Sequence, residues 1–327
     1  MEAFEYARPA SAKEAVKLLA EGSNGAEVLA GGGDLLSRMK DFISTPGRVV
    51  SLANARDLRG LEYDPARGLR IGAMVTLDEI ATHAGVRQHY SGLVQAVEDL
   101  GGPQIRNTGT VGGTLCQRPR CWYYRAGFGL LAMQNGKSLV PGGDNRYHAI
   151  FGNSGPAYFV CPSSLGPILI ALGAKVHILG PKGARELTAD KFFVTPKAEG
   201  EREIALQPDE IVTEVTVPPP PGPSAFYEIK QKAGLDWPLA TAAVVLRMNG
   251  HTVSSARVVL GQVAPVPWPS PEAEHALAGK TLSAAVADAA GKAAVANAAP
   301  LSRNAYKVTL ASVAVKRAVL RAAGMKA

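Results

Sequence analysis

Apolar and polar residues alternate in short segments over residues 1–55. Ser11 and Glu14 have the spacing of a helix capping box, and apolar residues recur after them at helical intervals. A short helix is expected from Leu35, with Asp34 as its cap. Strands are predicted at 4–6, 27–30 and 49–52. This pattern predicts a small lobe in which strands and helices alternate.

Residues 56–217 are predicted to form a second lobe. Thr76 and Glu79 repeat the capping-box spacing at the start of one of its helices. After the segment 116–125, the sequence up to about 155 is glycine-rich and has neither a helical nor a strand period. A loop of this length is expected to have a functional or interfacial role. The predicted elements are a strand at 69–73, helices at 76–84, 92–100 and 165–172, and a strand at 175–179.

A proline-rich run, Pro-Pro-Pro-Pro-Gly-Pro at 218–223, divides the chain. Such a run is stiff and extended and does not fit inside a packed element, so we interpret it as a linker. After it, the pattern predicts strands at 224–230, 240–248 and 256–260 and Ala-rich helices at 282–298 and 304–323. The expected organisation is α+β, with lobes at about 1–55 and 56–217 forming one domain (1–217), the linker at 218–223, and a compact C-terminal domain at 224–327.

Two glycine-rich segments are the strongest candidates for ligand binding. They are Ala30-Gly31-Gly32-Gly33-Asp34-Leu35 and Asn107-Thr108-Gly109-Thr110-Val111-Gly112-Gly113-Thr114. Glycine lets the backbone approach a ligand closely and turn its amides toward an anion. Either segment alone could be an ordinary tight turn. Since neither has a Walker lysine or the G-x-G-x-x-G spacing, the pair favours a long diphosphate cofactor such as FAD, held between two lobes, over ATP.

Composition and charge narrow the classes of function. The chain has 327 residues, of which 46% are hydrophobic and 19% charged, as expected for a globular protein with a substantial core. Its net charge of +7 favours an anionic ligand or an acidic partner. No Lys/Arg block or recognition motif supports nucleic-acid binding.

The location expected from the sequence is the cytoplasm. The N-terminal residues lack the pattern of a secretion signal, and no apolar run reaches the roughly 18 residues of a membrane helix. Three cysteines cannot all pair, which argues against a disulfide scaffold. A periplasmic location is the alternative if a partner carries the export signal for a folded complex.

Four motifs, in order over essentially the whole chain, carry a family resemblance. They are Phe4-Glu5-Tyr6-Ala7-Arg8-Pro9, the first glycine segment, Gln104-Ile105-Arg106 running into the second glycine segment, and Gly261-Gln262-Val263-Ala264-Pro265-Val266-Pro267. The sequence resembles the FAD-binding (medium) subunit of the molybdenum hydroxylases, the family of xanthine dehydrogenase, carbon monoxide dehydrogenase and aldehyde oxidoreductases. The resemblance implies a two-lobed FAD-binding domain of the vanillyl-alcohol-oxidase/PCMH type, followed by a small α+β domain.

The resemblance also implies how FAD is bound. The first glycine segment would wrap the pyrophosphate with backbone amides, and the second would close over it from the neighbouring lobe. Side chains of Asn107, Thr108 and Thr110 would add hydrogen bonds. The cofactor-binding residues predicted in these two segments are Leu29, Ala30, Gly31, Gly32, Gly33, Asp34, Leu35, Asn107, Thr108, Gly109, Thr110, Gly112, Gly113 and Thr114.

Four further residues are predicted to bind the cofactor. Ser164 stands where the family has an aspartate that makes a polar contact. Ile211 and Val212 match the segment whose backbone lies along the flavin ring. Lys230 falls in a basic stretch near the flavin, although the solvated face of an edge strand is an equally good interpretation of this lysine.

The cysteines bear on an additional metal centre. The segment from Gln117 to Arg125 resembles a subgroup that includes periplasmic aldehyde oxidoreductases and 4-hydroxybenzoyl-CoA reductase, in which an inserted loop binds a [4Fe–4S] cluster through four cysteines. Cys121 matches the first ligand, but no cysteine lies where the later ligands are expected. Three thiols cannot make a four-cysteine site. A site with His148 as a fourth, non-cysteine ligand is the alternative. The prediction is that loop 121–155 persists without this cluster and that the chain holds no metal.

The function implied is that of an electron-transfer subunit. It would take electrons from [2Fe–2S] clusters on a small partner and pass them through FAD to an external acceptor, while a molybdopterin centre on a large partner hydroxylates the substrate. No catalytic acid or base is predicted on this chain, because its histidines are scattered. The alternative is a self-contained FAD-dependent oxidase or reductase with the same FAD fold, which would need a complete active site in one chain.

Overall fold

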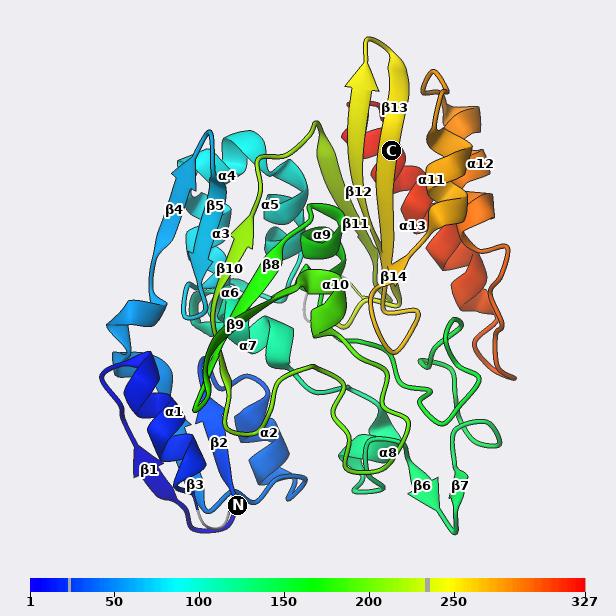
Figure 1. Cartoon of the computed structure of the whole chain (residues 1–327). Coiled ribbons are helices and arrows are strands. Elements are labelled where there is room, and N and C mark those ends of the chain that lie inside the picture. The colour runs from blue at the N-terminus through cyan, green and yellow to red at the C-terminus, as the bar shows by residue number, and fades with distance from the viewer. Residues whose placement is uncertain (23–24, 233–235, 327) are drawn as a thin grey trace.

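The computed structural model describes residues 1–22, 25–232 and 236–326. In this part of the chain, three sheets are flanked by helices, and a short hairpin, β6 (Met133–Gln134) with β7 (Lys137–Ser138), projects from a long loop (Figure 1). No helix within these ranges is long and apolar enough to cross a membrane.

The first lobe is a parallel sheet in the order β1-β3-β2. Its strands are parallel because each connection between them passes through a helix. The central strand is buried on both faces: Val50 packs against α1, and Val49 packs against α2. The Ser11 hydroxyl caps α1 by accepting from the Glu14 amide. The elements are β1 (Glu5–Ala7), α1 (Ala12–Ala20), β2 (Ala26–Leu29), α2 (Leu35–Lys40) and β3 (Arg48–Ser51).

The second lobe is an antiparallel sheet in the order β4-β5-β10-β8-β9, reached through two 3₁₀ turns at Leu52–Asn54 and Arg56–Leu58. Strand β10 returns from far along the chain to lie between β5 and β8, where Val215 pairs with Ile71 on one side and Val176 on the other. The strands are β4 (Leu61–Asp64), β5 (Gly68–Gly72), β8 (Lys175–Gly180), β9 (Gly183–Thr188) and β10 (Ile211–Val217).

Helices cover this second sheet. The capping box of α3 has both of its hydrogen bonds, from the Glu79 amide to the Thr76 hydroxyl and from the Thr76 amide to the Glu79 carboxylate, which confirms that prediction. The helices are α3 (Leu77–Thr82), α4 (Ala84–His89), α5 (Ser91–Glu98), α6 (Pro103–Thr108), α7 (Val111–Cys116), α9 (Leu165–Ala171) and α10 (Ala189–Phe192). A further short helix, α8 (Trp122–Arg125), lies in the long loop that carries β6 and β7 (Figure 1).

The C-terminal domain is a four-stranded antiparallel sheet covered on both faces. On β12, Ala243 and Val245 face the core of the second lobe, while Ala242 and Val244 face the three C-terminal helices. Burial on both faces explains why β12 is a continuous apolar run and not an alternating one. The elements are β11 (Ser224–Ile229), β12 (Ala240–Asn249), β13 (Thr252–Gly261), β14 (Trp268–Pro269), α11 (Pro271–Leu277), α12 (Ala284–Ala294) and α13 (Tyr306–Ala322).

Candidate functional site

The two glycine segments lie against each other, although they belong to different lobes. A Cβ atom added at Gly31 would lie 1.9 Å from the Thr108 carbonyl oxygen and 3.3 Å from the Cα of Gly109. Only glycine fits at Gly31, because the neighbouring atoms are backbone and cannot rotate away. The turn after β2 therefore packs directly on the turn between α6 and α7.

The first segment offers free amides. Within the described residues, the N–H groups of Gly31, Gly32, Gly33 and Asp34 have no hydrogen-bond acceptor. Gly32 has a φ of 80°, in the left-handed region that favours glycine, and Gly31 and Gly33 are exposed. Such a turn can donate several hydrogen bonds to an anion.

The second segment is built differently from the loop expected from the sequence. Residues 111–114 form the first turn of α7, capped by the Thr110 hydroxyl, which accepts from the Gly113 amide at 3.1 Å. The Gly112 amide donates to the carbonyl of Ala73 at 2.9 Å, so these glycines serve close packing. The expectation that both segments present an array of free amides is wrong for residues 111–114, because these amides donate to Thr110 and to the carbonyls of Ala73 and Val75, just after β5.

Some side chains of the second segment can still make hydrogen bonds to a ligand. Asn107 and Thr108 are exposed, and the Thr108 hydroxyl donates to the Gln104 carbonyl at 3.0 Å, which leaves its oxygen able to accept. Thr110 is buried; its hydroxyl oxygen accepts from the Gly113 amide, and its proton can still be donated. Thr114 is buried in α7.

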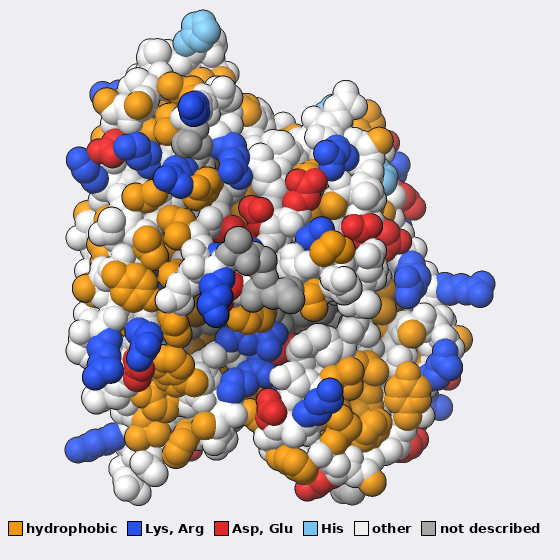
Figure 2. All heavy atoms as spheres, turned by 180° about the vertical axis from the view of Figure 1, so that it is seen from behind, with side chains coloured by type: hydrophobic (Ala, Val, Ile, Leu, Met, Phe, Trp, Pro, Cys, Tyr) orange, Lys and Arg blue, Asp and Glu red, His pale blue; other side chains and the backbone are white. Residues whose placement is uncertain are grey.

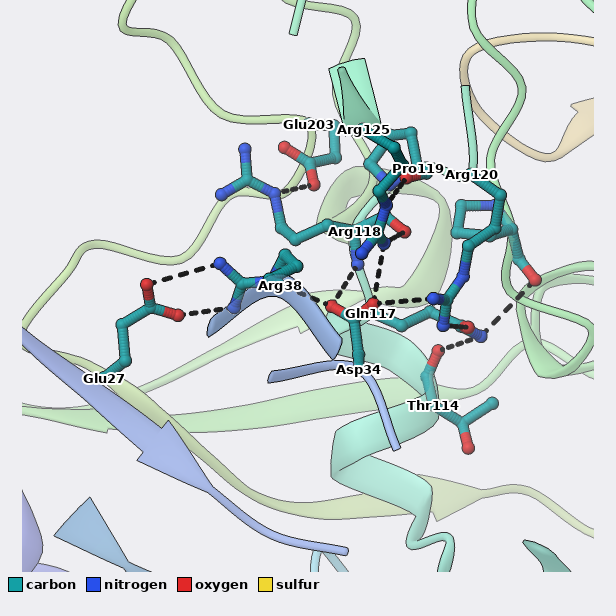
Figure 3. Close-up of polar contacts among 11 residues, drawn as sticks. Glu27, Asp34, Arg38, Thr114, Gln117, Arg118, Pro119, Arg120, Arg125 and Glu203 are labelled. Atoms are coloured by element: carbon teal, nitrogen blue, oxygen red, sulfur yellow. Dashed lines mark hydrogen bonds and ion pairs between the residues drawn. The ribbon is translucent and has the colours of Figure 1, made fainter. Parts of the chain in front are cut away.

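Asp34 does not cap α2, and this prediction from the sequence is wrong. Its carboxylate makes no hydrogen bond to the start of the helix. The carboxylate accepts hydrogen bonds from the Arg125 guanidinium at 2.7 Å and from the Arg118 backbone amide at 3.1 Å. It also forms ion pairs with Arg120 at 3.1 Å and with Arg38 at 3.2 Å (Figure 3). Charge-assisted donors bind a carboxylate more strongly than a helix amide does. Burial raises the pKa of Asp34, but the arginines outweigh burial and hold it below its ordinary value.

Three of these arginines, Arg118, Arg120 and Arg125, belong to residues 118–125, which we call the arginine segment. The sequence shows that these arginines lie close together in the chain, but only the fold shows which carboxylates they contact. Arg118 forms an ion pair with the buried Glu203, and Arg38 forms one with Glu27. Neither carboxylate was predicted from the sequence to belong to the site. Glu203 lies far along the chain from Arg118, and no local motif marks Glu27. Figure 2 shows Lys and Arg side chains gathered in a groove near the middle of one face.

The Ser164 segment lies next to the second glycine segment. The Gln117 side-chain amide donates to the carbonyls of Thr114, at 3.1 Å, and Pro162, at 3.3 Å. Ser164 is buried at the start of α9, and its side chain makes no capping bond.

Ile211 and Val212 begin β10, and their side chains are buried in two separate cores. Next to them, the Thr213 carbonyl accepts from the Ala73 amide at 2.8 Å, so this strand adjoins the residue on which Gly112 packs. With both side chains inside the protein, only the backbone of Ile211 and Val212 is available to a ligand.

Lys230 does not lie on a solvated strand face. Its side chain is 15% exposed, forms an ion pair with Glu228 and donates to the Asp99 carbonyl. Burial raises the pKa of Glu228 to about 7 despite this lysine. The groove beside them has a volume of about 410 Å³ and is lined by Asp99, Tyr227, Glu228, Lys230, Gln231, Lys232 and Arg321.

The cysteines are in two places. Cys121 lies with its sulfur 3.2 Å from Nε2 of His148, whose pKa burial lowers to about 4. Cys116 and Cys161 lie in the core of the second lobe, where burial raises the pKa of each thiol to about 12. Across the described ranges, no three or more His, Cys, Asp and Glu side chains gather as a metal site would need.

Comparison with known proteins identifies the class of protein to which this site belongs. Residues 2–220 match the FAD binding domain in molybdopterin dehydrogenase, and residues 224–322 match the CO dehydrogenase flavoprotein C-terminal domain. The chain therefore belongs to the FAD-binding subunits of the molybdenum-containing hydroxylases, which confirms the resemblance and the α+β fold predicted from the sequence.

Individual relatives cover nearly the whole chain. The aldehyde oxidoreductase FAD-binding subunit PaoB of Escherichia coli is 33% identical over 320 residues, 95% of each protein. The carbon monoxide dehydrogenase medium chain of Hydrogenophaga pseudoflava is 31% identical over 322 residues, 97% of this chain and 96% of its own. A solved structure of that bacterium's carbon monoxide dehydrogenase, which lacks the Mo-pyranopterin moiety, covers 100% of this chain and 99% of its own at 30% identity, with a TM-score of 0.77.

The residues of the site fit FAD. Free amides at 31–34 suit a diphosphate, and the hydroxyls of Thr108 and Thr110 lie in the segment that packs on this turn. The arginine segment adds positive charge beside them. The side chains around Cys121 do not fit a [4Fe–4S] cluster, because within the described ranges its sulfur has one other metal-ligating side chain beside it, that of His148.

Proposed function

We propose that this chain binds one FAD noncovalently between its two N-terminal lobes and serves as the electron-transfer subunit of a molybdenum hydroxylase. The observation that carries the proposal is the contact between Gly31 and the Thr108 carbonyl, beside a turn whose amides are free. Two lobes that meet at such a turn enclose a long cofactor whose anionic centre needs backbone donors.

Each part of the site has a role in this proposal. The amides of residues 31–34 bind the diphosphate, and the side chains of Asn107, Thr108 and Thr110 donate or accept hydrogen bonds from the second lobe. In the FAD complex the backbone at Ile211–Val212 and the side chain of Lys230 would lie near the flavin ring, and Ser164 would make a polar contact. Leu29 and Leu35 pack below the turn. Bound FAD supplies the electron-transfer chemistry; the chain positions it and tunes its surroundings.

The partners proposed are a large subunit with a molybdopterin centre and a small subunit with [2Fe–2S] clusters. The names of the relatives support this, since they are the FAD-binding subunit of an aldehyde oxidoreductase and the medium chain of a carbon monoxide dehydrogenase. Substrate, an aldehyde, an aromatic compound or an N-heterocycle, is oxidised on the large subunit, and electrons leave through FAD to an external acceptor. The complex resides in the cytoplasm, or in the periplasm if a partner carries the export signal.

Purification of the natively expressed complex tests this function. We expect this chain to co-elute with two partner chains, and the complex to contain molybdenum, iron and FAD. Removal of the partners should leave a yellow subunit that reduces no acceptor with the substrate. A free monomer that is fully active alone would contradict the proposal and favour a self-contained oxidase or reductase.

A further inference from the structure

Charged side chains from four separate parts of the chain form one network beside the free amides of the first glycine segment. Asp34 joins Arg38 of α2 to Arg120 and Arg125 of the arginine segment, and Arg38 continues to Glu27 (Figure 3). Arg118 forms an ion pair with Glu203. The neighbouring Arg202 is close enough for its charge to interact with the charges of both Arg118 and Glu203. Most of these side chains are largely buried, so their charges are weakly screened.

The network has more positive than negative charge. Its five arginines, Arg38, Arg118, Arg120, Arg125 and Arg202, face three carboxylates, Glu27, Asp34 and Glu203, among the described residues. The neighbouring Cys116 adds no negative charge, because burial raises the pKa of its thiol to about 12. Two positive charges are left uncompensated, and a diphosphate bridge, with one negative charge on each phosphate, would balance them.

Arg120 and Arg125 have hydrogen-bonding capacity to spare. Buried nitrogens at Nε of Arg120 and Nη1 of Arg125 find no acceptor within the described part of the chain. Arg120 shares Asp34 with two other guanidinium groups and stacks on the Trp237 ring, with its central carbon 4.3 Å from the ring centroid. Burial lowers the pKa of Arg120 to about 10, since the carboxylate of Asp34 only partly offsets burial and the repulsion of its neighbours, but the group stays protonated near neutral pH.

We propose that Arg120 and Arg125 bind the phosphate bridge of the flavin cofactor, so that the site selects a diphosphate flavin by charge as well as by backbone amides. This inference rests on the proposed function, because it places the same FAD in the same site. The carboxylate of Asp34 then acts as a positioning group: it orients the arginines from inside the glycine turn and does not contact the ligand, while the Asp34 amide remains one of the backbone donors.

Ligand binding by the full-length, flavin-free chain tests this. FAD, riboflavin, which has no phosphate, and inorganic pyrophosphate are titrated against the wild type, Arg120→Gln, Arg120→Lys and the control Lys137→Gln. The control removes the same charge from an exposed position on the same loop. We expect Arg120→Gln to weaken FAD binding by roughly 10- to 100-fold and to leave riboflavin binding within about twofold, since a charge-assisted hydrogen bond is lost only with the phosphate ligand. Arg120→Lys should recover part of the loss.

Two further readouts do not depend on the variants alone. Inorganic pyrophosphate should compete with FAD on the wild-type chain, and rising salt should weaken FAD binding less in Arg120→Gln than in the wild type. Equal losses for FAD and riboflavin, unchanged FAD binding in Arg120→Gln, or no competition by pyrophosphate up to about 10 mM, a weak-binding range, would overturn the inference. A wild-type chain that binds no FAD would overturn the proposed function first and this inference with it.

Discussion

Replacement of Gly31 by alanine tests whether the contact between the two lobes shapes the cofactor site. The added methyl group would lie 1.9 Å from the Thr108 carbonyl oxygen and 2.7 Å from its carbonyl carbon. Real Cβ atoms essentially never lie closer than 3.0 Å to such atoms. The two backbone segments would therefore have to separate by at least 1.1 Å (3.0 − 1.9), which moves the free amides away from the second lobe.

The size of the effect follows from overpacking. Forcing a methyl group into a closely packed site costs about 1–3 kcal/mol. If the cofactor bridges the two segments, most of this cost appears as lost FAD affinity. Since about 1.4 kcal/mol corresponds to a tenfold change in affinity, the FAD complex should be roughly 5- to 150-fold weaker. The melting temperature of the flavin-free protein should fall by a few °C or more for the same reason.

Gly33→Ala is the matched control. A Cβ at Gly33 meets no atom within 4 Å, and its φ does not lie in the left-handed region. We expect the flavin-free Gly33→Ala protein to melt within about a degree of the wild type, because an open, unstrained site accepts a methyl group. FAD affinity is measured by fluorescence titration of flavin-free protein. If Gly31→Ala binds FAD as tightly as the wild type and melts at the same temperature, the reasoning from the contact is refuted.

Three other predictions concern the cofactor, the metal and the pH dependence. Heat or acid denaturation should release free FAD, because the site binds it without a covalent bond; release of FMN alone, or flavin that stays on the chain, would contradict this. The isolated subunit should contain iron near zero, since Cys121 lacks cysteine partners among the described residues; about four iron atoms per chain would prove this prediction wrong. Burial lowers the pKa of Lys307 to about 7. Because an unfolded lysine titrates near pH ~10, the unfolded chain binds more protons between these values, and the free energy of unfolding should rise with pH from about 7 to ~10. Lys307→Met should flatten this rise in urea melts, whereas Lys316→Met, at a half-exposed lysine of the same helix, should not. Equal slopes would exclude Lys307 as the source of the rise.

Local signals in the sequence determined much of the fold. Capping at Thr76 and Glu79 depends on residues three positions apart, so the spacing alone predicts the start of α3. The apolar run of β12 and the proline-rich run at 218–223 are likewise visible within a short window. Four motifs in a fixed order were enough to identify the family, and two of them hold the glycine segments at which the backbones of the two lobes meet.

Only the tertiary structure decided how these parts meet. The sequence shows two glycine segments but not that Gly31 touches the Thr108 carbonyl, because that distance depends on the packing of one lobe against the other. It suggests Asp34 as a helix cap, yet arginines distant in the chain take its carboxylate, since charged donors outcompete a backbone amide. The sequence suggests that the amides of residues 111–114 are free for a ligand, but they donate to Thr110 at the start of α7 and to the carbonyls of Ala73 and Val75, just after β5. Contacts between residues far apart in sequence follow from packing, and no local pattern encodes them.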